Sequence, residues 1–153
     1  MTVTFRGTTE EVSQILHHHA VLRRGLEERV GAVCAAAEAG APFEAPVAAL
    51  QEFLAGEILP HAEAEEHTLY SAAASQARGG QLVAAMTAEH RTLAGLAAQL
   101  QAGAGAAAAA STAESIATLF ASHVAKENDL LLPALVDSGV DLAPLLARMH
   151  AAA

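Results

Sequence analysis

A five-residue pattern that begins with histidine and ends with glutamate occurs twice in this chain. The first copy runs from His61 to Glu65, and the second runs from His123 to Glu127. Residues four apart lie on the same face of a helix, so each copy places an imidazole beside a carboxylate. Both groups are common metal ligands. The repeat therefore predicts a metal site built from two helices.

A single histidine precedes each copy and lies on the hydrophobic stripe of its own segment. His19 continues the spacing of Val12 and Ile15, and His90 follows Met86 by four residues. Steps of three and four residues place such side chains on the buried face of a helix. Four histidines and two glutamates on four helices predict a pair of metal ions inside a bundle. The predicted ligands are His19, His61, Glu65, His90, His123 and Glu127.

The two glutamates are the strongest part of this prediction. A single buried histidine is common in protein cores, whereas a buried ionised carboxylate costs several kcal/mol unless it is paired or bound to metal. Lys126 points away from the face of Glu127. Arg23 lies one turn beyond His19 and could neutralise one glutamate but not both. A cation is therefore the better partner.

Imidazole and carboxylate ligands suit iron, zinc or manganese. The lone Cys34 excludes a thiolate cluster or an internal disulfide. Glu65 and Glu127 can each bridge two ions, and the histidines can complete the ends. Six ligands leave two ions with open positions, which O2, peroxide or NO could occupy. No residue is assigned a catalytic role or a role in binding an organic cofactor.

Several neighbouring residues remain as alternatives or supporting groups. His18 lies about 100° around the helix from His19, which favours His19 as the ligand. Glu66 could hydrogen-bond a ligand imidazole. Glu89 is a candidate acceptor beside the site, with direct ligation as the less favoured role. Tyr70 falls opposite His61 in helical phase and is expected to pack between helices or lie at the surface.

The composition favours an all-α protein. Hydrophobic residues make up 53% of the 153 residues, but much of this is alanine, and only 3% of residues are aromatic. Alanine has the highest helix propensity, and aromatic residues, which favour strands, are scarce. A chain of this length is sufficient for one domain. We therefore expect a single domain over residues 1–153, with its core over about 9–136.

Periodicity and helix breakers predict four long helices and one short helix. Helices are expected over about 9–39, 46–76 and 81–101, and a fourth opens at a capping box over 111–114. Pro60 predicts a kink, Gly79-Gly80 a stop, and residues 103–110 a loop. Asp141 can begin a short last helix. The connectors favour an antiparallel up-down-up-down four-helix bundle with a short C-terminal helix.

Charge and hydropathy exclude several classes of function. A net charge of −9 argues against nucleic-acid partners and against attachment to anionic lipid. The first seven residues lack the apolar run of a secretory signal. The longest uncharged stretch, 92–113, is too polar and glycine-rich to span a membrane. A cytoplasmic location is expected, whereas the oligomeric state is left open.

The six predicted ligands give the chain a resemblance to the hemerythrin family, in particular to bacterial hemerythrin-like domains with the His-His-Glu (HHE) pattern. The resemblance covers roughly residues 9–136 and includes the Leu-Leu-Leu-Pro-Ala run at 130–134. It implies a four-helix bundle with a non-haem di-iron centre. In that centre Glu65 and Glu127 would bridge the irons, and the four histidines would complete the coordination.

The chain departs from the oxygen-carrying hemerythrins at two points. Those proteins have two histidines one turn apart on the third helix, whereas Met86 and Ala94 lie one turn on either side of His90 here. Their last carboxylate is an aspartate at the fifth position after histidine, whereas Glu127 is at the fourth. The missing histidine implies an open coordination position, or one that Glu89 or water fills.

Two functions are compatible with this pattern. The first is a di-iron protein that binds or senses O2, NO or iron, and the second is a di-iron enzyme that acts on peroxide or other reactive oxygen or nitrogen species. Whether the protein is an enzyme is left open. A structural bundle with zinc or no metal is a third possibility. A ferritin-like site is disfavoured because no Glu-x-x-His occurs in the chain.

Overall fold

The computed structural model describes residues 4–76 and 79–152, and within these ranges the protein is helical with no strand. The helical segments form four long rods, which are numbered here along the chain. The first rod is α1 (Thr4–Ala39), and the third rod is α5 (Gly79–Gln99). A single 3-10 turn, η3 (Ala102–Ala104), links α5 to the next rod. The predicted all-α class is confirmed.

Two of the four rods contain π-helical turns. The second rod consists of α2 (Glu44–Phe53), η1 (Leu54–Ile58), α3 (Leu59–Glu65), η2 (Glu66–Tyr70) and α4 (Ser71–Ala74) without a break. The fourth consists of α6 (Ala106–Lys126), η4 (Glu127–Leu131) and α7 (Leu132–Asp137). Pro60 and Pro133 each lie just after a π segment, in the first turn of the following α-helix. A proline cannot donate its backbone hydrogen bond, which disturbs the turn before it.

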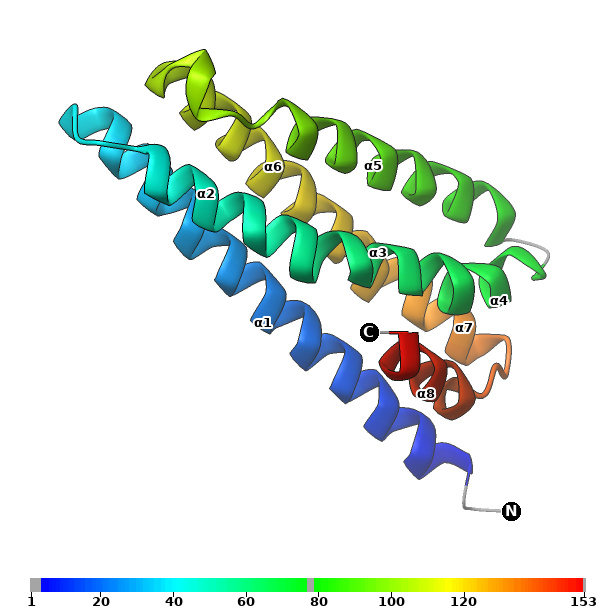
Figure 1. Ribbon diagram of the computed structural model, residues 1–153. Helices are drawn as coiled ribbons and strands as arrows, with labels where there is room; N and C mark the ends of the chain where they lie inside the picture. The colour runs from blue at the N-terminus through cyan, green and yellow to red at the C-terminus, as the bar shows by residue number, and fades with distance from the viewer. Residues whose placement is uncertain (1–3, 77–78, 153) are drawn as a thin grey trace.

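The rods lie side by side, as Figure 1 shows. α1 packs against α2 and α6, and α5 packs against α6 and α4. A short last helix, α8 (Leu142–Ala152), lies across α1, α3 and η2. The Asp141 side chain accepts a hydrogen bond from the Ala143 backbone N–H at 3.2 Å, which confirms the predicted helix start at Asp141.

The hydrophobic core is divided into two clusters. In α1, Ile15 belongs to one cluster and Leu22 to the other. In α5, Met86 belongs to the same cluster as Ile15, and Leu93 belongs to the same cluster as Leu22. The predicted ligands occupy the level between the clusters on each rod. A polar layer therefore separates two apolar halves of the interior.

Two sequence-based helix boundaries were wrong. Residues 106–110 are helical rather than a loop, so the capping box at 111–114 lies inside α6. The alanine run has high helix propensity, and Gly105 provides the turn before it with a φ of 97°. The first helix likewise begins at Thr4 rather than at about residue 9.

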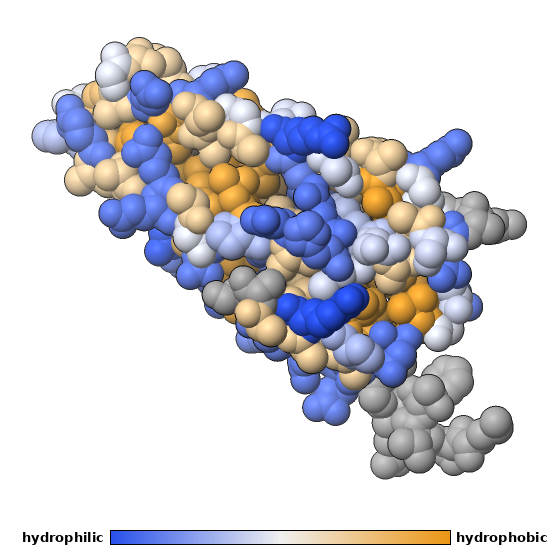
Figure 2. All heavy atoms as spheres, turned by 45° about the vertical axis from the view of Figure 1, so that its right-hand side comes forward, coloured by the Kyte–Doolittle hydropathy of each residue, from blue (hydrophilic) through white to orange (hydrophobic). Residues whose placement is uncertain are grey.

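The surface carries hydrophilic residues over the face drawn in Figure 2, with hydrophobic residues visible between them. The large exposed hydrophobic side chains among the described residues are Leu16, Val21 and Leu130. Across residues 4–76 and 79–152, no helix combines the length and hydropathy that a membrane span requires.

The second rod ends at Ala74, before the Gly79-Gly80 pair, as the predicted stop requires, and α5 begins at Gly79 itself rather than at residue 81. A Cβ atom at Gly79 would clash with the Ala73 carbonyl oxygen, whereas a Cβ at Gly80 would meet nothing within 4 Å. Gly79 thus permits close approach between α4 and the start of α5.

We expect Gly79→Ala to lower the free energy of unfolding by about 2 kcal/mol or more, because the backbone must move to relieve the clash. Gly80→Ala is the matched control, and its stability should be unchanged or higher by up to about 1 kcal/mol. Urea denaturation followed by circular dichroism measures both variants. Equal effects of the two substitutions would contradict the close approach.

Candidate metal centre

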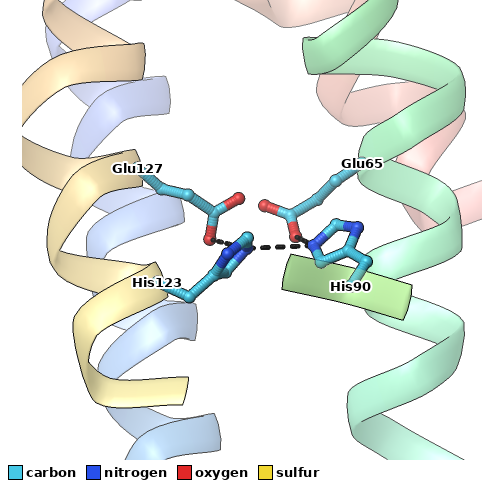
Figure 3. A group of neighbouring side chains, drawn as sticks. All are labelled: Glu65, His90, His123 and Glu127. Atoms are coloured by element: carbon cyan, nitrogen blue, oxygen red, sulfur yellow. Dashed lines mark hydrogen bonds and ion pairs between the residues drawn. The ribbon is translucent and has the colours of Figure 1, made fainter. Parts of the chain in front are cut away.

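The structure brings the six predicted residues together at the centre of the four rods. They come from α1, α3, α5, α6 and the first residue of η4, and Figure 3 shows four of them, with the two carboxylates facing each other. Five of the six are buried, and the side chain of His61 is 8% exposed. The cluster consists of His19, His61, Glu65, His90, His123 and Glu127.

The carboxylate of Glu65 lies near three of the histidines. Its carboxylate oxygens are 3.3 Å from His61 Nε2, 3.5 Å from His19 Nε2 and 3.8 Å from His90 Nε2. Glu127 lies near histidines from two different helices. Its Oε1 is 3.5 Å from His123 Nε2 and 3.7 Å from His19 Nε2. All four imidazoles thus direct Nε2 toward the carboxylates.

The donor atoms form two groups that each have the dimensions of a metal site. One group contains Glu65, His90, His123 and Glu127, and the other contains His19, His61 and Glu65. Within each group the ligand atoms lie within 4.8 Å of one another. Glu65 belongs to both groups, which is the placement expected of a bridging carboxylate.

Several of these atoms are buried without a hydrogen-bond partner among the residues that the structure describes. They include His19 Nε2, His61 Nε2 and Glu65 Oε2. A buried polar atom without a partner costs about 1–3 kcal/mol. Lone pairs on imidazole nitrogen and carboxylate oxygen that converge in this way fit a cation, so the residues present suit the predicted metal.

Polar groups outside the centre orient two of the imidazoles. His19 Nδ1 lies 2.7 Å from the side-chain oxygen of Asn128. His90 Nδ1 lies 3.2 Å from a carboxylate oxygen of Glu66, as the sequence analysis allowed. Such contacts fix the ring orientation and leave Nε2 free to bind metal. Asn128 was not predicted, because nothing in its type or spacing distinguishes it from a surface residue.

Glu89 is connected to the centre indirectly. Both of its carboxylate oxygens accept hydrogen bonds of 2.7 Å from Lys126 Nζ, and one oxygen lies 3.8 Å from His123 Nδ1. Glu89 is thus placed behind His123 rather than among the Nε2 atoms. Lys126 is directed toward Glu89 and away from Glu127, as predicted.

Tyr70 packs between helices, which was one of its two predicted positions, but its hydroxyl group reaches the centre, which was not predicted. It is 1% exposed, and its hydroxyl group donates a hydrogen bond of 2.9 Å to Glu127 Oε2. The same hydroxyl lies 3.0 Å from His123 Nε2 and 3.2 Å from His90 Nε2. The predicted orientation of Tyr70 assumed a regular α-helix, but Tyr70 lies in the π turn η2. A π turn joins residues five apart by its backbone hydrogen bonds, and this brings Tyr70 to the same face as Glu65.

A π turn begins at or directly after each glutamate of the repeated pattern. η2 begins one residue after Glu65, and η4 begins at Glu127 itself. π turns within α-helices occur frequently at functional sites. The internal repeat seen in the sequence therefore extends to the backbone.

The remaining alternatives lie outside the centre. Arg23 pairs with Glu27 at 2.8 Å, and both side chains are 52% exposed, so Arg23 does not neutralise a buried glutamate. His18 is exposed, and its ring centroid lies 4.9 Å from that of His61. Of the two adjacent histidines, His19 is the one that faces the carboxylates.

The two buried carboxyl groups differ in protonation when no metal is present. Burial and the neighbouring charge of Glu65 raise the pKa of Glu127 well above its usual range. Burial also acts to raise the pKa of Glu65, but His61 and the other hydrogen-bonding neighbours hold it well below that range. Burial and the electrostatic effect of the nearby carboxyl groups of Glu127 and Glu65 raise the pKa of Tyr70, so its phenol keeps its proton.

The comparisons with known proteins agree with this geometry. The sequence profile described as hemerythrin HHE cation binding domain matches residues 11–135. No curated protein and no solved structure matches the chain. The matched range includes all six residues of the centre and ends before α8.

The raised pKa of Glu127 leads to a testable pH dependence. In the metal-free protein the folded state keeps a proton that the unfolded chain loses above pH 4.5, so this contribution to stability is lost as pH rises through the raised pKa. Glu127→Gln cannot ionise. We expect its advantage in unfolding free energy over the native protein to grow with pH, by up to about 1.4 kcal/mol per pH unit.

Urea unfolding in the presence of a chelator at pH 5 and pH 8 measures this difference. The exposed Glu63 lies on the same helix, and Glu63→Gln provides the control, for which no such growth is expected. A constant difference between Glu127→Gln and the native protein across this range would contradict the assignment.

Proposed function

The chain belongs to the hemerythrin HHE cation-binding domain family, and on that basis we propose that it binds two non-haem iron ions at the candidate centre. Glu65 and Glu127 bridge the ions in this proposal. The four histidines bind through Nε2, His61 and His19 on one side and His90 and His123 on the other. Bound iron would supply open coordination positions for a small molecule such as O2, NO or peroxide.

The observation that supports two ions rather than one is the position of Glu65. It is the only residue shared by the two groups of potential ligands found in the described part of the chain. One ion held by His90 and His123 would leave His19 Nε2 and His61 Nε2 buried without a hydrogen-bond partner. Iron accepts both imidazole and carboxylate ligands, which is consistent with the donors present.

We further infer that the four rods form one antiparallel up-down-up-down bundle, and that residues 1–153 form a single domain. The contacts of α1 with α2 and α6, and of α5 with α4 and α6, support a closed ring of four neighbours. The turn between α1 and α2 spans only residues 40–43, and short connections favour antiparallel neighbours.

The proposed role of the centre is to bind or sense O2, NO or iron itself. The buried donors include His19 and His90, whose rings are oriented by Asn128 and Glu66, and together they provide a preorganised site. A small molecule is the expected partner. The cytoplasmic location and the lack of nucleic-acid partners stay predictions from the charge and the first residues of the chain.

An enzyme that acts on peroxide or related species is the second candidate, and Tyr70 is the observation that favours it. Its phenol hydroxyl lies within 3.2 Å of both His90 Nε2 and His123 Nε2. Met86 and Ala94 provide no further histidine on α5. Tyr70 can therefore donate a hydrogen bond or a proton to a molecule held beside these two histidines.

Substitution of single ligands tests the metal centre. Iron-loaded native protein should contain about two irons per chain, whereas Glu65→Ala should retain almost none, because both groups depend on this carboxylate. His61→Ala should lose about one iron. Elemental analysis and the optical spectrum of the oxidised protein measure the outcome.

The same rod provides matched controls for these variants. Glu63 and His67 are about 75% and 74% exposed and do not face the centre. Glu63→Ala and His67→Ala should therefore keep the native iron content. Unchanged iron in both Glu65→Ala and His61→Ala would contradict the metal site, and zinc in place of iron would contradict the proposed cofactor.

Tyr70→Phe tests the choice between binding and catalysis. If the protein acts on peroxide, removal of the hydroxyl should lower steady-state turnover by about 10- to 100-fold while iron content is kept, because one positioned proton donor is lost. Oxygen electrode measurements with iron-loaded protein follow this turnover. Absence of peroxide turnover in the native protein would exclude an enzyme that acts on peroxide and would favour the binding role.

A further inference from the structure

A cavity of about 250 Å³ lies between α1, the second rod and α8, and His61 is the one residue of the metal centre that lines it. The volume is several times the roughly 30 Å³ that one water molecule occupies in the liquid. His61 also belongs to the ligand group with His19 and Glu65. The cavity therefore borders the ring of a proposed metal ligand.

The lining of the cavity changes from polar to apolar toward its interior. The outer residues are exposed and polar, and they include Gln14, His18, Glu57 and His150. The inner walls are buried and apolar, and they consist of Ile15, Ala64, Leu146 and Met149. An apolar wall disfavours ions, which would lose their hydration there, and admits small neutral molecules.

The helix α8 closes one side of this cavity with residues that lie beyond the range of the family match. Leu146, Met149 and His150 all lie on α8, which begins at Leu142, seven residues after the end of the family match at 135. α8 packs against α1, α3 and η2. Its side chains thus determine how wide the cavity is at the level of His61.

We propose that this cavity is the entry route by which a small neutral molecule reaches the metal centre, and that Leu146 and Met149 on α8 set its width. The inference rests on the proposed function for the identity of the destination. The route itself is a property of the metal-free protein. It leads to the His19 and His61 side of the centre, away from Tyr70, which contacts His90 and His123.

The first experiment measures access to His61 without any metal. Diethyl pyrocarbonate, a small neutral reagent, modifies the imidazole nitrogens of metal-free protein, and mass spectrometry of fragments gives the rate at each histidine. Leu146→Ala should increase the rate at His61 several-fold, and Met149→Phe should decrease it. The exposed His67 provides an internal reference whose rate should stay unchanged.

Leu145→Ala is the matched control. Leu145 and Leu146 are 7% and 6% exposed on the same helix, but only Leu146 lines the cavity. A general loosening of α8 would affect His61 equally in both variants, and that result would overturn the proposal. Lack of any acceleration in Leu146→Ala would overturn it as well.

The second experiment uses reduced, iron-loaded protein and follows NO association by stopped-flow absorbance. The association rate should rise in Leu146→Ala, fall in Met149→Phe and stay native in Leu145→Ala. If the reagent reaches His61 as expected but the protein binds no iron, the entry route stands and the proposed function fails. If iron binds and NO association is the same in all variants, the route is contradicted.

Discussion

The burial of two carboxylates at the same level of the interior is the constraint on which the rest of the structure depends. Glu65 and Glu127 are each 1% exposed, and like charges so close together disfavour each other's ionisation. The surrounding histidines, and in our proposal two cations, compensate this cost. Tyr70 donates a hydrogen bond to Glu127, and Asn128 and Glu66 orient the rings of His19 and His90.

This polar level also determines how the rods are built. Each rod changes from one apolar cluster to the other where it passes the centre, as Ile15 and Leu22 do around His19. The two rods that carry a histidine and a glutamate contain π turns beside the glutamate. A turn with one additional residue changes the direction of the following side chains. The site and the irregular backbone are therefore parts of the same arrangement.

Regular helical spacing was sufficient to predict the six residues at the centre, because each lies on the apolar stripe of a long helix. It failed at Tyr70, since a constant rotation per residue does not hold through η2. Asn128 follows Glu127 in η4 and contacts α1, a relation between distant segments that one sequence does not contain. The alanine run at 106–110 was ambiguous because glycine and alanine together suit either a loop or a helix.

The position of Tyr70 has a spectroscopic consequence. The chain contains no tryptophan and one tyrosine, so emission excited near 280 nm comes from a single phenol. That phenol hydrogen-bonds directly to Glu127 inside the centre. The ultraviolet fluorescence of the protein is thus an intrinsic local reporter, sensitive to any ion or molecule that enters the polar layer, and it needs no attached dye.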